Sequence, residues 1–257
     1  MVVAWSAVAL FALATAGWVL SVIRRNANVV DEFWGMGQIV LTATCLTVGE
    51  ITTVRSWLCA ALVVTWGLRL TAYLAARNRD RGEDWRHREA RDHRPRFVWR
   101  SLPEVFWLQL VGGGLVIGLP VFAVVSVPQP ALSWVDGLGV VIWAVGFSVE
   151  TIADKQLARF RSDPANRGCV MHRGLWRYSR HPNYFGETAV WVGIALLGVA
   201  AGSWWALLSP VMVLIIVLRI SGVAAMEAHL GATRGDQYAT YMRTTSAFVP
   251  LPKRSAT

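Results

Sequence analysis

Residues 150–187 hold ionisable and aromatic side chains whose types and spacing could support chemistry. Glu150 ends a mostly apolar run, and Asp154 and Arg161 follow at four and eleven residues, so a helix would place all three on one face. A carboxylate at the depth of a membrane is costly and usually functional. The alternative is a salt-bridged helix end at the membrane surface, with no ligand.

A second set follows in the segment Gly-Leu-Trp-Arg-Tyr-Ser-Arg-His-Pro-Asn-Tyr-Phe-Gly-Glu, residues 174–187. Guanidinium groups bind phosphates through paired hydrogen bonds, and aromatic rings stack on flat rings. Glycine lets the backbone approach a ligand closely. The set therefore suits a nucleotide-like cofactor that carries phosphates and a base. The alternative is an interfacial belt of aromatic side chains mixed with cytoplasmic arginines.

The elements that must position these residues are membrane helices. Hydrophobic residues make up 54% of the chain and charged residues only 16%, whereas a soluble domain carries about 25% charged residues. A membrane-spanning helix needs about 20 apolar residues. We therefore predict an all-α integral membrane protein, a bundle of about seven transmembrane helices. The predicted spans are residues 2–23, 35–49, 57–76, 105–127, 134–153, 188–201 and 203–223.

The basic residues predict the orientation of this bundle. With the N-terminus outside and the C-terminus in the cytoplasm, the inner segments hold 22 of the 25 lysines and arginines. The net charge of +9 is thus explained by topology, and we predict no nucleic-acid partner. We expect an inner membrane of a bacterium as the location, with the ligand site facing the cytoplasm. Three scattered cysteines predict neither a disulfide framework nor a metal site.

We treat residues 1–257 as a single polytopic domain whose cofactor-binding half is 134–257. The first large inner loop, residues 77–100, is rich in arginine and also contains acidic residues. It could anchor to anionic lipid headgroups. Alternatively, its part around Glu83–Arg86 could fold over a phosphate-bearing ligand.

Residues 174–187 resemble the signature of DUF1295, a domain family of unknown function. That family is related to the steroid 5-alpha-reductases, the sterol reductases and the isoprenylcysteine carboxyl methyltransferases. The resemblance extends from Asp31–Gly35 through Gly82–Arg86 to Thr245–Pro250, and so covers nearly the whole chain. The central motif is specific, and the flanking matches are weaker.

The resemblance implies one of two chemistries. Reductases of this superfamily bind NADPH and deliver hydride to an activated carbon–carbon double bond, as in 3-oxo-5-alpha-steroid 4-dehydrogenases. The methyltransferases bind S-adenosylmethionine. Asn183 and Glu187 resemble the reductase branch, which we favour. Arg180–Pro182, Glu227 and His229 are shared with the methyltransferases, which stay the alternative.

Carried over by resemblance, one set of residues would bind the cofactor. Asp154 and Arg161 match reductase contacts, whereas Glu150 stands where steroid reductases have asparagine. Asn183 and Glu187 would hold the nicotinamide or ribose end. The full set is Asp154, Arg161, Arg177, Tyr178, Arg180, His181, Asn183, Tyr184, Glu187, His229 and Tyr238, in which Arg177, Arg180 and His181 would face phosphates.

Reduction of an enone also needs a hydrogen-bond donor at the enolate oxygen and a proton for the adjacent carbon. The catalytic candidates are Tyr73, Asp31 and Glu32, although the glutamine–glutamate pair of the steroid reductases is absent. Asp31 could equally cap a helix. We expect a lipid or steroid-like substrate from the bilayer. A non-enzymatic lipid-binding membrane protein is a third possibility.

Overall fold

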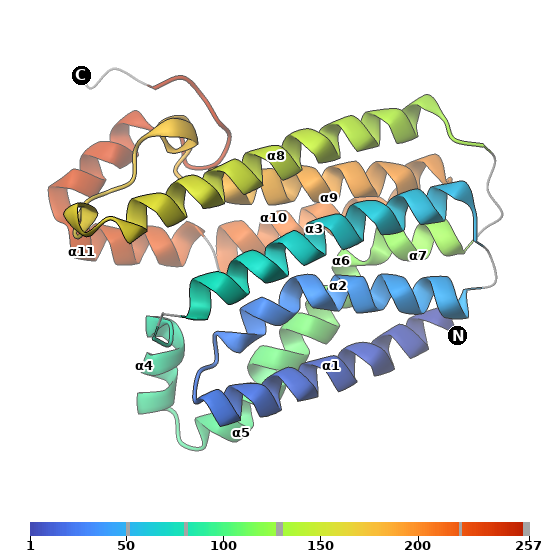
Figure 1. Cartoon of the computed structure of the whole chain (residues 1–257), viewed down its shortest axis with the longest axis horizontal. Coiled ribbons are helices and arrows are strands. Elements are labelled where there is room, and N and C mark those ends of the chain that lie inside the picture. Colours follow the sequence, from blue (N-terminus) through green and yellow to red (C-terminus); the bar gives the residue numbers. More distant parts are fainter. Residues whose placement is uncertain (50–51, 80–81, 127–130, 221–222, 254–257) are drawn as a thin grey trace. The chain divides into compact units, whose positions relative to one another are not determined.

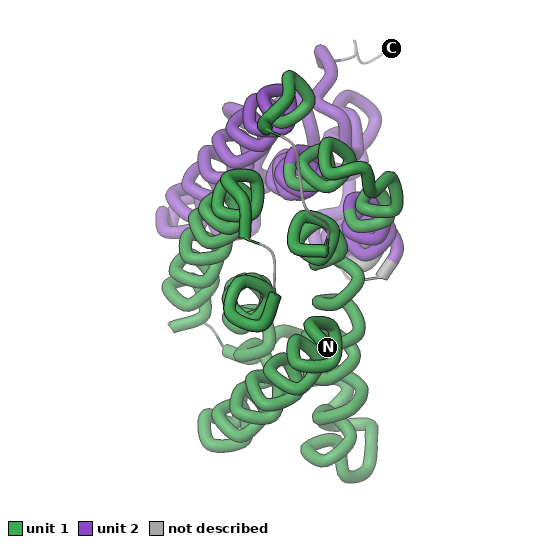
Figure 2. The backbone as a smooth tube through the Cα atoms, turned by 90° about the vertical axis from the view of Figure 1, so that its right-hand side faces the viewer, with its two compact units in different colours: residues 1–136, 194–209 green, residues 137–193, 210–257 purple. Residues whose placement is uncertain are grey.

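The computed structural model describes residues 1–49, 52–79, 82–126, 131–220 and 223–253, and these residues fold into helices without a strand (Figure 1). They form two compact units, coloured separately in Figure 2. Unit 1 contains residues 1–136 and 194–209, and unit 2 contains residues 137–193 and 210–257. Most of the predicted cofactor half, 134–257, therefore belongs to unit 2.

Unit 1 is built from three long helices and a chain of shorter ones. They are α1 (Val2–Arg24), α2 (Val29–Val48), α3 (Val54–Arg79), α4 (Trp85–His93), α5 (Phe97–Ser101), the π-helix η1 (Leu102–Gly113), α6 (Gly114–Ile117), α7 (Leu119–Val125) and the 3-10 helix η4 (Trp204–Leu207). Helices α1, α2 and α3 follow one another through short connections and pack as neighbours in sequence order. Helix α4 begins where the Asp84 side chain accepts a hydrogen bond from the Arg86 N–H, and it ends before Pro95.

Close helix contacts in unit 1 depend on glycine. A Cβ atom on Gly35 of α2 would lie 2.6 Å from the carbonyl oxygen of Gly67 on α3. A Cβ on Gly67 would in turn lie 2.8 Å from the Gly35 oxygen. Small residues let membrane helices approach closely, which is what the α2–α3 crossing requires.

One ion pair of unit 1 is almost completely buried. The Arg55 guanidinium donates to both carboxylate oxygens of Asp136, at 2.7 and 3.0 Å, and the two side chains are 1% and 2% exposed. Ser133 also donates to Asp136 from its N–H and its hydroxyl. A buried ion pair loses its hydration, and further hydrogen bonds to its polar atoms offset part of that cost. The two hydrogen bonds from Ser133 have this effect on Asp136.

Unit 2 is centred on two long helices. Its elements are α8 (Trp134–Ser162), the 3-10 helices η2 (Pro164–Asn166) and η3 (Gly174–Arg177), α9 (Pro182–Ala200), α10 (Leu208–Ile215), the π-helix η5 (Ile216–Ile220) and α11 (Val223–Thr244). The ends of α8, α9 and α10 continue into unit 1. Helix α11 is kinked at Gly235, whose φ is 51°.

Helices α8 and α9 cross at two glycine pairs. A Cβ on Gly193 would lie 2.5 Å from the Gly139 oxygen, and a Cβ on Gly146 would lie 2.7 Å from the Gly186 oxygen. The lower-numbered glycine of α8 meets the higher-numbered glycine of α9, so the two helices are antiparallel. This contact brings the end of α8 beside the start of α9, where the motif of residues 174–187 enters the helix.

Among the described residues, four helices are long and apolar enough to cross a membrane: α1, α3, α8 and α9. The bent pair Phe97–Ile117 and Leu119–Val125, at 46° to each other, makes a fifth if it counts as one span. Residues 35–48 of the predicted span 35–49 lie within α2, which also carries Asp31, Glu32 and Gln38. The predicted span 203–223 corresponds to the shorter apolar segment Trp204–Arg219. The all-helical membrane class is therefore confirmed, with four or five candidate spans.

Candidate cofactor site

The carboxylates predicted on α8 are buried at its contact with α9. Glu150 and Asp154 are each 3% exposed. A Cβ on Gly186 would lie 2.6 Å from the Glu150 backbone nitrogen, so no larger residue fits there without moving a helix. The sequence thus positions two carboxylates by placing glycine on the opposite helix.

Asp154 is joined to the first turn of α9 by a hydrogen bond. The Asn183 amide nitrogen donates to the Asp154 carboxylate at 3.3 Å. The amide oxygen of Asn183 is also buried, and it accepts no hydrogen bond within the part of the chain that the structure describes. Buried polar atoms are normally satisfied, so this oxygen is a candidate acceptor for a ligand.

The loop that precedes α9 is fixed to α8. The Gln156 side chain accepts a hydrogen bond from the Leu175 N–H at 2.9 Å, and the Trp176 indole donates to the Ala153 oxygen at 3.1 Å. Gly174 has a φ of 59°, a region that favours glycine. A Cβ at Gly174 would also collide with Gln156. The motif is therefore held in a defined position.

Arg180 is engaged within the protein. Its guanidinium donates to Glu227 of α11 at 2.7 Å, and to the carbonyl oxygens of Met242 and Thr245 at 2.9 and 2.7 Å. Burial raises the pKa of Glu227, but the neighbouring His181 and Arg180 lower it further, so its pKa lies below the usual value. Glu227 is therefore ionised at neutral pH and pairs with Arg180.

Aromatic rings surround this ion pair. His181 is 4% exposed, stacks on Tyr184 with ring centroids 5.5 Å apart, and places its Nε2 atom 3.4 Å from Glu227. The Tyr241 hydroxyl donates to the Trp176 oxygen. Burial, and secondarily the charge of Glu227, raises the pKa of Tyr238 to about 12. Tyr238 is therefore a neutral side chain beside the ion pair of Arg180 and Glu227.

The other predicted cofactor residues have different exposures. Arg161 in the last turn of α8, Arg177 at the end of η3 and the adjacent Tyr178 are exposed. Glu187, one turn after Asn183, and His229 on α11 are partly buried. Arg161, Arg177 and Tyr178 thus lie on the surface of unit 2. The predicted residues that are buried or partly buried near the start of α9 and on α8 and α11 include Asp154, Arg180, His181, Asn183, Tyr184 and Tyr238.

The catalytic candidates Asp31, Glu32 and Tyr73 all belong to unit 1, whereas the predicted cofactor residues all belong to unit 2. Asp31 accepts a hydrogen bond from Arg77 at 2.7 Å, and Glu32 accepts one from Arg24 at 3.3 Å. The Arg69 guanidinium lies 5.5 Å from the centre of the Tyr73 ring. The cap of α2 is Asn28, so Asp31 lies in the first helical turn and is not the cap.

A polar cluster beside Asp31 joins four segments of unit 1, and we name it the amide hub. The Asn28 side chain donates to the Gly82 oxygen at 3.2 Å and accepts from the Asp84 N–H at 2.9 Å. Glu83 accepts hydrogen bonds from the Ala27 N–H and from two nitrogens of Arg91. The hub consists of Ala27, Asn28, Asn78, Gly82, Glu83, Asp84 and Arg91. Two acidic residues of the loop, Glu83 and Asp84, thus make contacts within unit 1.

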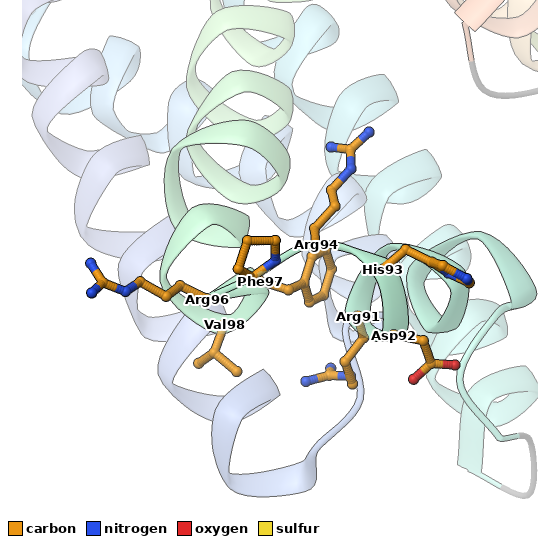
Figure 3. A pocket seen from close by; sticks show the side chains of 8 residues that line it. Arg91, Asp92, His93, Arg94, Arg96, Phe97 and Val98 are labelled. Carbon is orange, nitrogen blue, oxygen red and sulfur yellow. The ribbon is translucent and has the colours of Figure 1, made fainter.

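A hollow of about 520 Å³ lies where α4 joins α5, lined by residues 91–98 (Figure 3). Arg91 is already bound to Glu83, and its guanidinium lies 5.2 Å from the centre of the Phe97 ring. The side chains of Arg94 and Arg96 point away from each other in Figure 3. The arginine side chains of the hollow therefore do not converge on one point where a ligand could bind.

The match to a family model covers residues 17–245, and the family's description is "Protein of unknown function (DUF1295)". The chain belongs to the DUF1295 family. An uncharacterised protein of Schizosaccharomyces pombe is 26% identical over 217 residues. The match covers 74% of this chain and 63% of that yeast protein, so the chain corresponds to less than two thirds of its relative.

Two contacts of this DUF1295 protein were not predicted from its sequence. Gln156 fixes the motif loop, and Glu227 is the ion-pair partner of Arg180. Glu227 is 47 residues from Arg180, so no local spacing could indicate the pair. The sequence offers two signals for Glu227, namely its place in the mostly apolar start of α11 and its resemblance to the methyltransferases.

Proposed function

We propose that this DUF1295 protein is an NADPH-dependent membrane reductase that delivers hydride to an activated C=C bond of a steroid-like or other lipid enone. The observation that carries the proposal is the Asp154–Asn183 pair, in which the Asn183 oxygen is buried and accepts no hydrogen bond among the described residues. The apolar helices of both units support a substrate from the bilayer. We also propose the full seven-span arrangement, with the C-terminus and the cofactor site on the cytoplasmic side.

The residues present fit the polar groups of a dinucleotide. The Asn183 oxygen can accept from a carboxamide N–H, and the Asp154 carboxylate can accept from a ribose hydroxyl. Arg161 and Arg177 are exposed on unit 2, and guanidinium groups of this kind can bind phosphates. NADPH, when bound, would supply the hydride. The chain's own residues would orient the ring and keep water from it.

The substrate side requires a donor for the developing enolate oxygen and a proton for the adjacent carbon. Tyr73 carries a hydroxyl group that can donate a hydrogen bond and is the preferred candidate. Asp31 and Glu32 are bonded to Arg77 and Arg24. Each carboxylate thus already accepts a hydrogen bond from an arginine of unit 1. We therefore rank these two carboxylates below Tyr73.

A second function is favoured by one observation. Arg180, expected to face phosphates, is bound to Glu227, while two carboxylates, Glu150 and Asp154, are buried nearby on α8. Carboxylates suit the positive charge of S-adenosylmethionine better than the phosphates of NADPH. A methyltransferase that uses this cofactor is therefore the alternative. A non-enzymatic lipid-binding protein would bind neither cofactor tightly.

Thermal unfolding of the detergent-solubilised protein with NADPH, NADH or S-adenosylmethionine separates these functions. We expect NADPH to raise the unfolding midpoint, and Asp154→Asn and Asn183→Ala to abolish that rise. Arg243→Gln is the matched control, because Arg243 is exposed and bonded to Thr240 on its own helix. Enone-dependent loss of NADPH absorbance tests the reaction. A shift with S-adenosylmethionine alone would reverse the ranking, and no shift with any of the three cofactors would reject both enzymes.

A further inference from the structure

The C-terminal segment of unit 2 is attached to the motif loop by several hydrogen bonds. We propose that Arg180 and Glu227 are positioning residues, which fasten residues 242–251 to the loop and so hold Asn183 in place for the cofactor. The cofactor part rests on the proposed function. The attachment itself rests on the hydrogen bonds between residues 178–180 and residues 242–251.

Arg180 makes contacts from both its backbone and its side chain. Its N–H donates to the Ser246 oxygen at 2.8 Å, and its guanidinium holds the Met242 and Thr245 oxygens. These two carbonyls lie in the last turn of α11 and just beyond it, where helices leave carbonyls unpaired. The same guanidinium bonds Glu227 near the start of α11. One side chain thus joins both ends of this helix to the motif loop.

Neighbouring residues continue the attachment along the chain. The Ser179 hydroxyl donates to the Phe248 oxygen at 2.7 Å, and the Leu251 N–H donates to the Tyr178 oxygen at 3.0 Å. The Phe248 ring contacts Phe185, with centroids 5.8 Å apart. Phe185 is two residues after Asn183 on α9. Movement of the C-terminal segment would therefore be transmitted to the first turn of α9.

These contacts distinguish a positioning role from direct phosphate binding. The Arg180 side chain is 10% exposed, and its charge is offset by Glu227 at 2.7 Å. If Arg180 bound a phosphate, Glu227 would repel that phosphate. If Arg180 is a positioning residue, Glu227 supports the site. The two roles therefore predict opposite effects of removing the Glu227 charge.

The experiment compares Arg180→Lys, Glu227→Gln, the milder Glu227→Asp and the double variant Arg180→Lys/Glu227→Gln, with Arg243→Gln as control. Amide hydrogen exchange of residues 245–251 is measured without cofactor. We expect exchange to rise by at least about tenfold in both single variants, because local opening becomes easier. The double variant should exchange no faster than the worse single variant, since Glu227 acts on this segment through Arg180. Arg243→Gln should exchange like the wild type.

The same variants are then titrated with NADPH. We expect Arg180→Lys and Glu227→Gln to weaken binding in the same direction, each by roughly tenfold, with Glu227→Asp recovering part of the loss. Tighter NADPH binding in Glu227→Gln together with weaker binding in Arg180→Lys would overturn the proposal in favour of phosphate contact. Unchanged exchange at 245–251 would overturn the fastening. If exchange rises as expected but the wild-type protein binds no NADPH, the fastening is supported and the proposed function fails.

Discussion

The amide hub of unit 1 and the motif residues of unit 2 are both polar clusters, but they differ in how completely their atoms are paired. In the hub, both polar atoms of the Asn28 side chain have partners, and Glu83 accepts from three donors. In unit 2, the Asn183 oxygen and the Thr245 hydroxyl are buried without a hydrogen-bond partner among the described residues. Two asparagines at the starts of α2 and α9 thus have opposite environments.

This difference separates a cluster that holds the fold together from one that could bind a ligand. A polar cluster whose atoms are paired fixes the positions of the segments that it joins, and it offers little to a ligand. A buried acceptor without a donor costs free energy unless something else supplies the donor. The hub therefore explains how the arginine-rich loop is attached to α2. The Asp154–Asn183 pair remains the better candidate for a ligand.

The largest expected loss of stability is that of Asn28→Ala. The substitution leaves the Gly82 oxygen and the Asp84 N–H without their partner, and we expect the free energy of unfolding to fall by about 2–4 kcal/mol. Thermal and denaturant unfolding in detergent measure it. Asn28→Asp keeps the acceptor for Asp84 and should lose about half as much. A loss no greater than that of Asn183→Ala would remove the contrast between the clusters.

Glu83→Gln should have a smaller effect. The Glu83 side chain, 9% exposed, accepts from two nitrogens of Arg91, and glutamine keeps only a neutral acceptor. We expect a loss of about 1–2 kcal/mol, because charge-assisted paired hydrogen bonds are stronger than neutral ones. Glu89→Gln on the exposed side of α4 is the control. Equal losses in the two variants would show that general charge, and not the hub, is responsible.

The hub should also weaken in acid. Burial raises the pKa of Glu83, but hydrogen bonds from Arg91 and Ala27 lower it further, so its folded pKa lies below its ordinary 4.5. The stabilisation is present above 4.5 and is lost as pH falls through the folded pKa. Unfolding midpoints measured downward from pH 6 should fall more steeply for wild type than for Glu83→Gln. Parallel curves would contradict this origin.

The smallest stability change is expected for Asn183→Ala. Within the described part of the chain, its side chain donates one hydrogen bond, of 3.3 Å to Asp154, and its oxygen accepts none. We expect unfolding without ligand to change by no more than about 1 kcal/mol, because the loss of one donor to Asp154 is offset by removal of a buried, unpaired oxygen. The rise of the unfolding midpoint with NADPH should nevertheless disappear. If the variant is destabilised but NADPH still raises its unfolding midpoint, Asn183 has a structural role and does not bind the cofactor.

The local chemistry of the motif could be predicted from its sequence, because residue types and helical spacing act over a few residues. The spacing of Glu150 and Asp154 predicted a shared helix face, and both carboxylates are buried on α8. Partners of distant side chains could not be predicted. Arg180 could bind a phosphate or a carboxylate equally well by type, and only the packing of α11 shows that it binds Glu227.

The sequence by itself determined that this chain is an all-helical membrane protein of the DUF1295 family, because long apolar runs and a fourteen-residue motif are local properties. Only the tertiary structure decided which polar residues are paired. The glycine contacts of α8 and α9 bring Asp154 to Asn183, and the return of the C-terminal segment gives Arg180 its partners. These contacts join residues far apart in the chain, so they depend on how the helices pack.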